Sequence, residues 1–293
     1  MKLIITGSES FIGKELIRQC KEKEIKIIGI DIIDKENSEF EYHKISIYTP
    51  EIINIIPNDV DAIIHLAALS RDSDCKGKAY ECFENNVMGT LNLIKCAKEK
   101  YVKQFIFASS EWVYDEFKEK QSKDEEYPIN SLSLTSEYAL SKLTSEINLK
   151  QQYVNGFCST TILRFGIIYG PRKNNWSAVE AIASQIKNND EINVGSLKNG
   201  RRFIHVSDIV NGIIKSIGLK GFHTINLCGD KIITIKDIIE NCEEIFNKKI
   251  RIIENNPNEQ NIRNPDNTKA KAILGWSPEI DLKEGLKSIE KFL

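Results

Sequence analysis

The sequence lacks the features that mark several classes of protein. Its 293 residues contain no long basic block and no apolar run near the roughly 20 residues that a membrane helix needs. The formal net charge is −2 and the pI is about 6.2, so bulk charge gives no support for nucleic-acid binding. The N-terminal MKLIITG carries one lysine and enters a strand-like run, too short for a signal peptide. We therefore expect a cytoplasmic protein with neither a membrane nor a nucleic-acid partner.

Cysteine and histidine show no pattern typical of a metal site. The seven cysteines include no CxxC pair and no metal-type spacing, and we expect reduced thiols, most of them buried as small hydrophobic groups. His65 and His205 each lie in an apolar run without clustered carboxylates. The sequence predicts no bound metal.

The pattern of apolar residues predicts an α/β fold. Hydrophobic residues make up 41% of the chain and charged residues 28%, as in ordinary globular proteins. Short β-branched runs alternate with helical patterns through the first half, which indicates βαβ units and a parallel sheet covered by helices on both faces. The predicted strands are 2–5, 26–30, 62–66, 104–108 and 160–164, and the predicted helices are 12–23, 79–100 and 136–154.

The alternation loosens after the YGPR motif at 169–172. Later signals are an amphipathic segment at 177–187, a strand-like RFIHV at 202–206, a polar stretch at 254–267 and a helical pattern at 282–292. We therefore predict a doubly wound parallel sheet with a smaller, interleaved C-terminal lobe.

A glycine turn joins the first predicted strand to the first predicted helix. The run TGSESFIG places Gly7 and Gly13 on either side of Ser10, where such turns usually carry a middle glycine. Glycines permit a tight turn and close helix packing, while amides at a helix N-terminus receive a pyrophosphate. Asp31 ends the next strand, where a carboxylate hydrogen-bonds ribose hydroxyls and repels a 2′-phosphate. The pattern predicts a Rossmann domain that binds NAD in preference to NADP.

The change of pattern after the first half of the chain gives the expected domain division. The NAD-binding Rossmann domain is expected at 1–168, with 202–229 returning to it. The substrate-binding lobe is expected at 169–201 and 230–293.

Tyr138 and Lys142 form a candidate proton-transfer pair. They lie four residues apart in SEYALSK, so a helix would place both on one face. A neighbouring cation favours the phenolate, and a general base works best when its pKa approaches the operating pH. Ser110 closes the strand FIFASS, where its hydroxyl could hold a substrate alcohol. Chance often places Tyr and Lys at this spacing on a solvated helix face. The neighbouring motifs therefore decide whether this pair is catalytic.

With those motifs, the sequence resembles the extended short-chain dehydrogenase/reductase family, the NAD-dependent epimerases and dehydratases of nucleotide sugars. The resemblance covers almost the whole chain, through TGSESFIG, HLAA at 65–68, NVMGT at 86–90, SSEWVY at 109–114, YALSK at 138–142, RFGIIYGPR at 164–172, RRFIHVSD at 201–208 and LGWSP at 274–278. It implies an NAD-dependent enzyme that acts on a nucleotide sugar as a homodimer.

The resemblance also implies roles for individual residues. Tyr138 matches the general base, Lys142 its ribose-binding and pKa-lowering partner, and Ser110 the hydroxyl that holds the reacting alcohol. The residues expected around NAD are Gly7, Ser10, Phe11, Ile12, Gly13, Asp31, Ile32, Ser46, Ile47, Leu66, Ala67, Ala68, Asn86, Tyr138, Lys142 and Phe165. The residues expected around the substrate are Ser70, Ser110, Arg172, Trp176, Arg201 and Arg263. Arg201 and Arg263 match arginines that grip the nucleotide diphosphate.

Several of these residues also have plainer interpretations. Either arginine would be unremarkable on a protein surface, Asn86 is also typical of a helix start, and Trp176 is equally compatible with core packing. Four positions depart from the family pattern: Ser46 replaces an Asp, Asp115 a Gly, Ile167 an Asn and Arg202 an Asp. These departures predict a substrate pocket unlike that of the best-known members.

Glu111 leaves the later chemistry open. It matches a position where some sugar 4,6-dehydratases carry an acid that protonates the leaving hydroxyl, while the epimerases carry a small residue. The adjacent Trp112 would raise the carboxyl pKa by desolvation, but those dehydratases place a second acid there. The sequence favours an epimerase acting through C4 oxidation. A dehydratase is the alternative, followed by a decarboxylase, a reductase or a non-catalytic NAD-binding relative.

Overall fold

The structure is a computed structural model that describes residues 1–114, 116–118, 121–174 and 176–293. Asp115, one of the departures from the family pattern, lies outside the described residues. The chain divides into two compact units. Unit 1 comprises Met1–Asp115, Pro128–Arg164 and Ile213–Ile225, and unit 2 comprises Glu116–Tyr127, Phe165–Gly212 and Asn226–Leu293.

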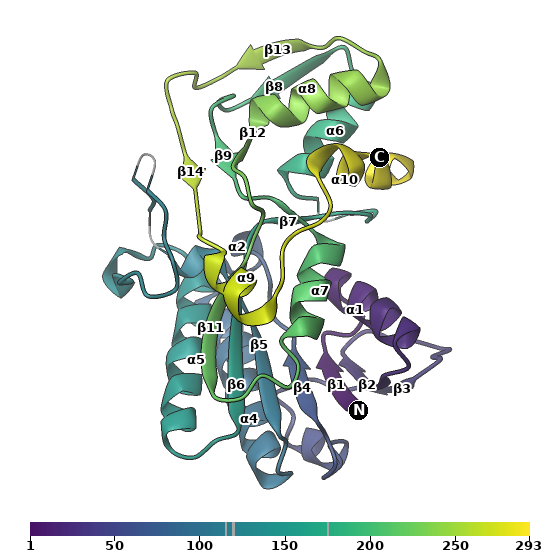
Figure 1. Cartoon of the computed structure of the whole chain (residues 1–293), viewed down its shortest axis with the longest axis vertical. Coiled ribbons are helices and arrows are strands. Elements are labelled where there is room, and N and C mark those ends of the chain that lie inside the picture. Colours follow the sequence, from purple (N-terminus) through teal and green to yellow (C-terminus); the bar gives the residue numbers. More distant parts are fainter. Residues whose placement is uncertain (115, 119–120, 175) are drawn as a thin grey trace. The chain divides into compact units, whose positions relative to one another are not determined.

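A seven-stranded sheet organises unit 1 (Figure 1). Its strand order is β11-β6-β5-β4-β1-β2-β3, and β1 pairs in parallel with β2 and β4, β2 with β3, and β4 with β5. The strands are β1 (Lys2–Thr6), β2 (Lys26–Asp31), β3 (Glu41–Lys44), β4 (Ala62–His65), β5 (Gln104–Ser110), β6 (Ser159–Phe165) and β11 (Phe222–Leu227). The predicted doubly wound α/β fold is confirmed.

Helices cover both faces of this sheet (Figure 1). Because crossovers between parallel strands are right-handed, and the chain steps from β1 to β2 in one direction but from β4 to β5 in the other, the connecting helices lie on opposite faces. The helices are α1 (Phe11–Glu22), α2 (Asp72–Cys75), α3 (Ala79–Phe83), α4 (Gly89–Glu99) and α5 (Glu137–Val154). On the α4 and α5 face, Ile4, Ile63 and Phe105 join Leu93 and Leu149 in one buried cluster.

Unit 2 is built from short strands and amphipathic helices. Its elements are β7 (Ile168–Tyr169), α6 (Ala178–Asn188), β8 (Glu191–Val194), β9 (Gly200–Arg201), β10 (Ile204–His205), β12 (Ile233–Thr234), α8 (Ile235–Phe246), β13 (Arg251–Glu254), β14 (Ile262–Arg263), α9 (Thr268–Leu274) and α10 (Leu282–Ile289), while α7 (Val206–Lys215) crosses the boundary between the units. Val179, Ile182, Ile238 and Leu286 belong to its own buried core.

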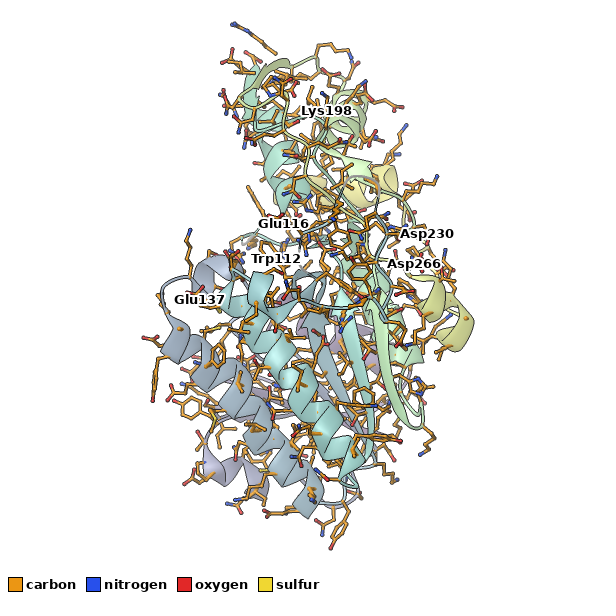
Figure 2. All side chains as sticks on the ribbon, turned by 90° about the vertical axis from the view of Figure 1, so that its left-hand side faces the viewer. Trp112, Glu116, Glu137, Lys198, Asp230 and Asp266 are labelled. Carbon is orange, nitrogen blue, oxygen red and sulfur yellow. The ribbon has the colours of Figure 1, made fainter. Side chains whose placement is uncertain are left out.

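Side-chain caps begin the two longer helices of unit 2. Ser177 and Glu180 form a capping box at α6, as Thr234 and Asp237 do at α8, and each box satisfies amides that the helix itself leaves unpaired. Elsewhere in this unit the Asn267 side chain donates to Asp230 Oδ1 at 2.8 Å, which brings Asp230 close to the segment that carries Asp266 (Figure 2).

The predicted elements of the first half are close to those observed. All five predicted strands are confirmed to within two residues at each end, and the helix predicted at 79–100 contains a π-helical turn at Glu84–Met88. The strand predicted at 202–206 is largely wrong, because only Ile204–His205 are strand and α7 begins at Val206. An apolar run of only five residues is too short to show whether its apolar positions repeat with the period of a strand or of a helix.

Six of the seven cysteines are buried, as predicted. In the part of the chain that the structure describes, none of the helices has both the length and the apolar character to span a bilayer.

Candidate active site

Tyr138 and Lys142 lie on the buried face of the first turns of α5. The helix begins there because the Ser136 side chain accepts a hydrogen bond from Ala139 N at 3.2 Å and Glu137 places negative charge in the first turn, where the helix dipole favours it. The one-turn spacing then brings the phenol and the ammonium to the same side, and both side chains are buried.

The Lys142 ammonium is anchored to the strand next to α5. Its Nζ donates to Ala108 O at 2.8 Å and lies 4.8 Å from the ring centroid of Phe107 and 6.0 Å from that of Tyr138. Burial lowers the pKa of Lys142 to about 8, although Glu146 acts in the opposite direction. The amine can therefore change its protonation state near physiological pH, which suits a group that assists proton transfer.

The Tyr138 phenol does not reach a low pKa in the chain by itself. Burial raises the pKa of Tyr138 to about 12, and a hydrogen bond with Ser110 only partly counters this effect. The Lys142 ammonium is bonded to Ala108 O, and the lowering of the Tyr138 pKa by Lys142 stays a prediction. A positive charge beside the phenol would favour the phenolate.

Ser110 and Glu111 occupy the end of β5. Ser110 Oγ accepts from Trp112 N at 3.2 Å and so begins the turn that follows the strand. Glu111 is completely buried, whereas the next residue, Trp112, which Figure 2 labels, is partly exposed. Ser110, Tyr138 and Lys142 are thus brought together at one strand end, and Glu111 is the next residue along the chain.

A buried ion pair supports this strand end, and the sequence analysis missed it. Glu146 accepts from Arg164 Nη2 at 2.7 Å and from Ser109 Oγ at 2.5 Å, while Arg164 Nη1 donates to the Tyr114 hydroxyl at 3.0 Å. Glu146 follows Lys142 by one helical turn, so it lies on the same face as Tyr138 and Lys142. The spacing could have indicated this pair from the sequence, because it predicts that Glu146 is buried, and a buried carboxylate needs a cationic partner.

Asn86 connects the segment after β4 to α5. Its side-chain amide accepts from Leu69 N at 2.8 Å and donates to Leu69 O and Ser141 Oγ, both at 3.0 Å. Through these contacts the buried Asn86 amide holds Leu69, the neighbour of Ser70, next to α5, the helix that carries Tyr138. Asn86 thus acts through other residues, and its place in a π-helical turn agrees with the frequent occurrence of such turns at functional sites.

His65 is held in a network of hydroxyl groups. Its Nδ1 lies 2.8 Å from Thr6 Oγ1 and its Nε2 lies 2.9 Å from Thr90 Oγ1. Thr90 donates its proton to Asn86 O at 2.6 Å, which assigns the donor role to His65 Nε2. Burial lowers the pKa of His65 to about 3, so this side chain is a neutral structural group. No cluster of three or more potential metal ligands occurs among the described residues.

The glycine turn is closely packed around β1 and α1. Gly7 has a φ of +71°, and a Cβ there would lie 2.7 Å from Ala67 N; a Cβ on Gly13 would lie 2.2 Å from Gly7 O. Ser10, the residue in place of the middle glycine, accepts from Gly13 N at 3.1 Å and caps α1. Ser10 therefore contributes a helix cap where the missing glycine would contribute only space.

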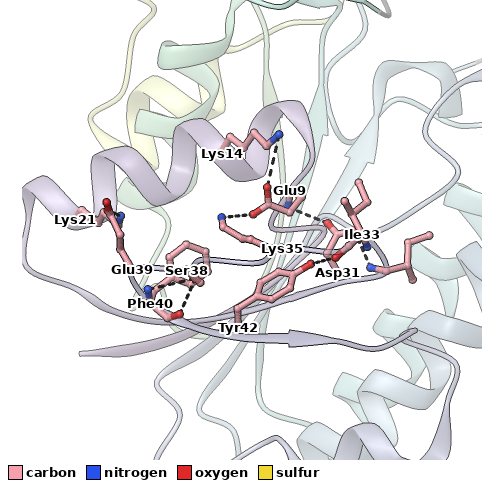
Figure 3. Close-up of polar contacts among 11 residues, drawn as sticks. Glu9, Lys14, Lys21, Asp31, Ile33, Lys35, Ser38, Glu39, Phe40 and Tyr42 are labelled. Carbon is pink, nitrogen blue, oxygen red and sulfur yellow. Dashed lines mark hydrogen bonds and ion pairs between the residues drawn. The ribbon is translucent and has the colours of Figure 1, made fainter.

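Asp31 lies at the end of β2, against the glycine turn (Figure 3). Asp31 Oδ2 accepts from Glu9 N at 2.8 Å, and Oδ1 accepts from Ile32 N at 2.8 Å and from Ile33 N at 3.3 Å. Each carboxylate oxygen has two lone pairs, so the side chain can also accept from hydroxyl groups of a ligand. The backbone amides fix its orientation for that purpose.

The other residues expected around the cofactor differ in exposure. Ala67 and Ala68 are half-buried just after β4, as are Phe11 and Ile12 at the start of α1 and Ser46 after β3, while Ile32 is exposed. Leu66, Ile47 and Phe165 are buried, and Ile47 belongs to the α4 core cluster. Phe165 belongs to unit 2, and the others belong to unit 1.

The arginines expected at the substrate gather within unit 2. Arg201 and Arg263 are register partners on the parallel strands β9 and β14. Arg201 Nη1 donates to Gly200 O and Asn261 O, and the Arg263 guanidinium lies 5.0 Å from the Phe117 ring centroid. The pairing puts the two arginines on neighbouring strands, and guanidinium groups suit phosphate oxygens.

The remaining residues expected at the substrate are placed differently. Arg172 Nε donates to Glu180 at 2.7 Å, and Trp176 Nε1 donates to Arg172 O at 2.9 Å, so these two support the start of α6. Ser70 is exposed in unit 1. Arg202, one of the departures from the family pattern, donates to Asn264 Oδ1 at 2.6 Å.

Comparison with known proteins gives one family. The model of the NAD dependent epimerase/dehydratase family matches residues 3–228. UDP-glucuronic acid decarboxylase 3 of Arabidopsis thaliana is 28% identical, with 99% of this chain and 88% of that protein covered. UDP-glucuronate 4-epimerase of Thermodesulfobacterium geofontis is 26% identical, with 97% and 93% covered.

Solved structures agree with this result. The UDP-glucuronic acid 4-epimerase of Bacillus cereus, in complex with UDP-glucuronic acid and NAD, has a TM-score of 0.86 and 25% identity, covering 100% of this chain and 98% of that one. The UDP-glucose 4-epimerase of Thermotoga maritima has a TM-score of 0.87 at 22% identity, with the same coverage. The latter likeness establishes a shared fold.

Proposed function

Since the chain belongs to the NAD-dependent epimerase/dehydratase family, we propose that it is a nucleotide-sugar 4-epimerase that works through a 4-keto intermediate. The observation that carries this proposal is the group formed by Ser110, Tyr138 and Lys142, in which the phenol is hydrogen-bonded to the serine and the ammonium is anchored one helical turn away. This group can remove a proton from a secondary alcohol, which the oxidation at C4 requires.

The residues of the glycine turn fit the NAD that the family uses. A Cβ on either Gly7 or Gly13 would collide with backbone atoms, so the turn keeps its backbone close to the N-terminus of α1, where amides can receive the pyrophosphate. Asp31 offers carboxylate oxygens for the ribose hydroxyls. When bound, NAD supplies the hydride acceptor and a positive charge.

The chain's own groups divide the proton chemistry among them. Ser110 orients the C4 hydroxyl toward the Tyr138 phenolate, which accepts the hydroxyl proton. After the 4-keto sugar has turned over and C4 has been reduced on its other face, Tyr138 returns the proton to the same oxygen. Lys142 holds the ribose and stabilises the phenolate electrostatically. Because the pKa of Tyr138 in the chain alone is about 12, the phenolate is a minor species there, and the positive charge of bound NAD would favour it.

We propose a UDP-linked sugar as the substrate. The relatives named above are a UDP-glucuronic acid decarboxylase and a UDP-glucuronate 4-epimerase, and a curated relative of Bacillus subtilis, 28% identical, is described as an uncharacterized UDP-glucose epimerase. The paired arginines Arg201 and Arg263 supply cationic groups suited to a diphosphate. UDP-glucuronate and UDP-glucose are therefore the first substrates to test.

Dehydration is the second candidate, favoured by Glu111, whose fully buried carboxyl group directly follows Ser110 along the chain and offers the general acid that loss of water requires. Decarboxylation is the other, favoured by the decarboxylase among the relatives. Both reactions begin with the same C4 oxidation and differ only in the fate of the ketone.

The reaction is tested by incubating the purified protein with UDP-glucuronate and UDP-glucose, then reading products by mass spectrometry and NMR. We expect the C4 epimer at unchanged mass, in the wild type and in Glu111→Gln alike. Loss of carbon dioxide from UDP-glucuronate, or loss of water that Glu111→Gln abolishes, would replace the epimerase assignment. No turnover by protein that binds NAD would instead indicate a binding protein.

We also propose that the chain forms a homodimer, as expected from the family. The exposed apolar side chains Leu140, Ile147 and Val154 recur every seven residues along α5, which gives one apolar stripe on the helix.

In sedimentation velocity at about 20 μM, the wild type should run as a dimer and Ile147→Glu as a monomer, because a buried unpaired carboxylate opposes association. Leu132→Glu is the control, since Leu132 is the most exposed leucine and lies off α5. A monomeric wild type would overturn the proposal.

A further inference from the structure

We infer that Glu9 is a second determinant of cofactor choice, which excludes NADP by neutralising the two lysines that would otherwise bind its 2′-phosphate. The inference concerns the adenosine end of the cofactor. It rests on the family's use of NAD and is independent of the reaction proposed above. The structural basis is the cluster of polar contacts around Glu9, Asp31, Lys14 and Lys35 (Figure 3).

Glu9 occupies the glycine turn directly against Asp31. Its backbone N–H donates to Asp31 Oδ2 at 2.8 Å, so the Glu9 side chain leaves the backbone beside the carboxylate that is expected to meet the ribose hydroxyls. The side chain of Glu9 is only 10% exposed. A 2′-phosphate on that ribose would therefore approach both carboxylates together.

Two lysines converge on the Glu9 carboxylate from different elements (Figure 3). Lys35, in the segment after β2, places its Nζ 2.5 Å from Glu9 Oε1, and Lys14, on α1, places its Nζ 3.6 Å from Oε2. The Lys35 ammonium also lies 4.6 Å from the ring centroid of Phe40, a cation–π contact that restrains it at the turn.

The charge balance at this place explains the effect on cofactor choice. Lysine binds phosphate as a point charge, and two free lysines would exceed the single negative charge of Asp31. With Glu9 present, the four side chains sum to zero, and a phosphate must displace a carboxylate to reach either ammonium. Asp31 then remains as the repulsive group.

The pKa of a neighbouring tyrosine, Tyr42, is affected by the same carboxylates. The pKa of Tyr42 is raised to about 12, first by burial and then by the charges of Asp31, Glu9 and Asp34. The direction of this shift agrees with the two carboxylates, Asp31 and Glu9, lying close to the phenol.

The variant that tests the inference should fold normally. Lys14 is largely exposed and Lys35 partly so, so water can solvate both ammonium groups when Glu9 loses its charge. Glu9→Gln keeps the side-chain shape and the backbone N–H that binds Asp31. It removes only the charge.

The experiment measures dissociation constants for NAD and NADP by isothermal titration calorimetry, without substrate. We expect Glu9→Gln to bind NADP at least tenfold more tightly than the wild type, with the NAD constant changed less than threefold. Adding Lys35→Met to Glu9→Gln should reverse most of that gain. Glu22→Gln is the matched control, because it removes the same charge from Glu22, which pairs with Arg18 on α1 away from the glycine turn.

Two results would overturn the inference. One is a ratio of NADP to NAD constants in Glu9→Gln within twofold of the wild-type ratio. The other is a gain in NADP affinity that survives when both lysines are replaced, Lys35→Met together with Lys14→Met. Thermal unfolding of each variant identifies a loss of folding, in which case Glu9→Ser replaces Glu9→Gln under the same criteria. Because no turnover is measured, failure of the epimerase assignment would leave these outcomes interpretable.

Discussion

Tyr138→Phe should lower kcat by about 10²–10⁴-fold, the range typical of losing a positioned general base. The substitution removes one oxygen atom from a buried ring and leaves the ring contact with Lys142. Steady-state turnover of a UDP-sugar, with the amount of bound NAD measured in parallel, separates loss of chemistry from loss of cofactor. We expect NAD to remain bound.

The pH dependence of wild-type turnover provides a second readout. Because the base acts as the phenolate and burial raises the pKa of Tyr138 to about 12 in the chain alone, the ionised fraction increases with pH below that value. Activity should therefore rise from pH 6 to about pH 8, the range in which the Lys142 ammonium that stabilises the phenolate stays largely charged, and the residual activity of Tyr138→Phe should lack this rise.

The control for the base is Tyr101→Phe, which removes a hydroxyl group from an exposed tyrosine of the same unit and should leave turnover unchanged. If Tyr138→Phe retained more than a tenth of wild-type kcat, the phenol would not be the base. If it lost NAD instead, Tyr138 would act in binding.

Glu146→Gln should destabilise the cofactor-free protein by about 3–5 kcal/mol, the typical cost of leaving one member of a buried ion pair without its partner. Both side chains of the Arg164–Glu146 pair are 6% exposed. The amide leaves the Arg164 guanidinium uncompensated, and it also weakens the contact with Ser109. Urea denaturation followed by circular dichroism gives the free energy of unfolding by linear extrapolation.

Two comparisons make this prediction specific. Glu22→Gln breaks an exposed pair with Arg18 and should cost no more than about 1 kcal/mol. The double variant Glu146→Leu/Arg164→Met removes both buried charges and should recover most of the lost stability. A loss below about 1 kcal/mol in Glu146→Gln would mean that water reaches the Arg164 guanidinium.

The local patterns of the chain were enough to predict the sheet and the positions of the key side chains along it. The run TGSESFIG, with a strand before it and a helix after it, indicated the glycine turn, and the spacing of Tyr138 and Lys142 indicated a shared helix face. Such signals depend on neighbours within a few residues. The segment at 202–206 was misassigned for the same reason, because two strand residues run directly into α7.

Contacts between distant residues could not be predicted in this way. Glu146 meets Arg164 across 18 positions, and Asn86 meets Ser141 across 55. No repeating pattern in the sequence indicates either contact, since each forms only when separate helices and strands pack together. The same holds for Glu9, whose role at the turn depends on Lys35, 26 positions away.

By itself, then, the sequence determined the α/β fold, the glycine turn, the family and the candidates for proton transfer, because all of these are encoded in short runs and their order. Only the tertiary structure decided the electrostatic state of those candidates. Burial raises the pKa of Tyr138 and lowers that of Lys142, since desolvation depends on everything packed around a group and not on its neighbours along the chain.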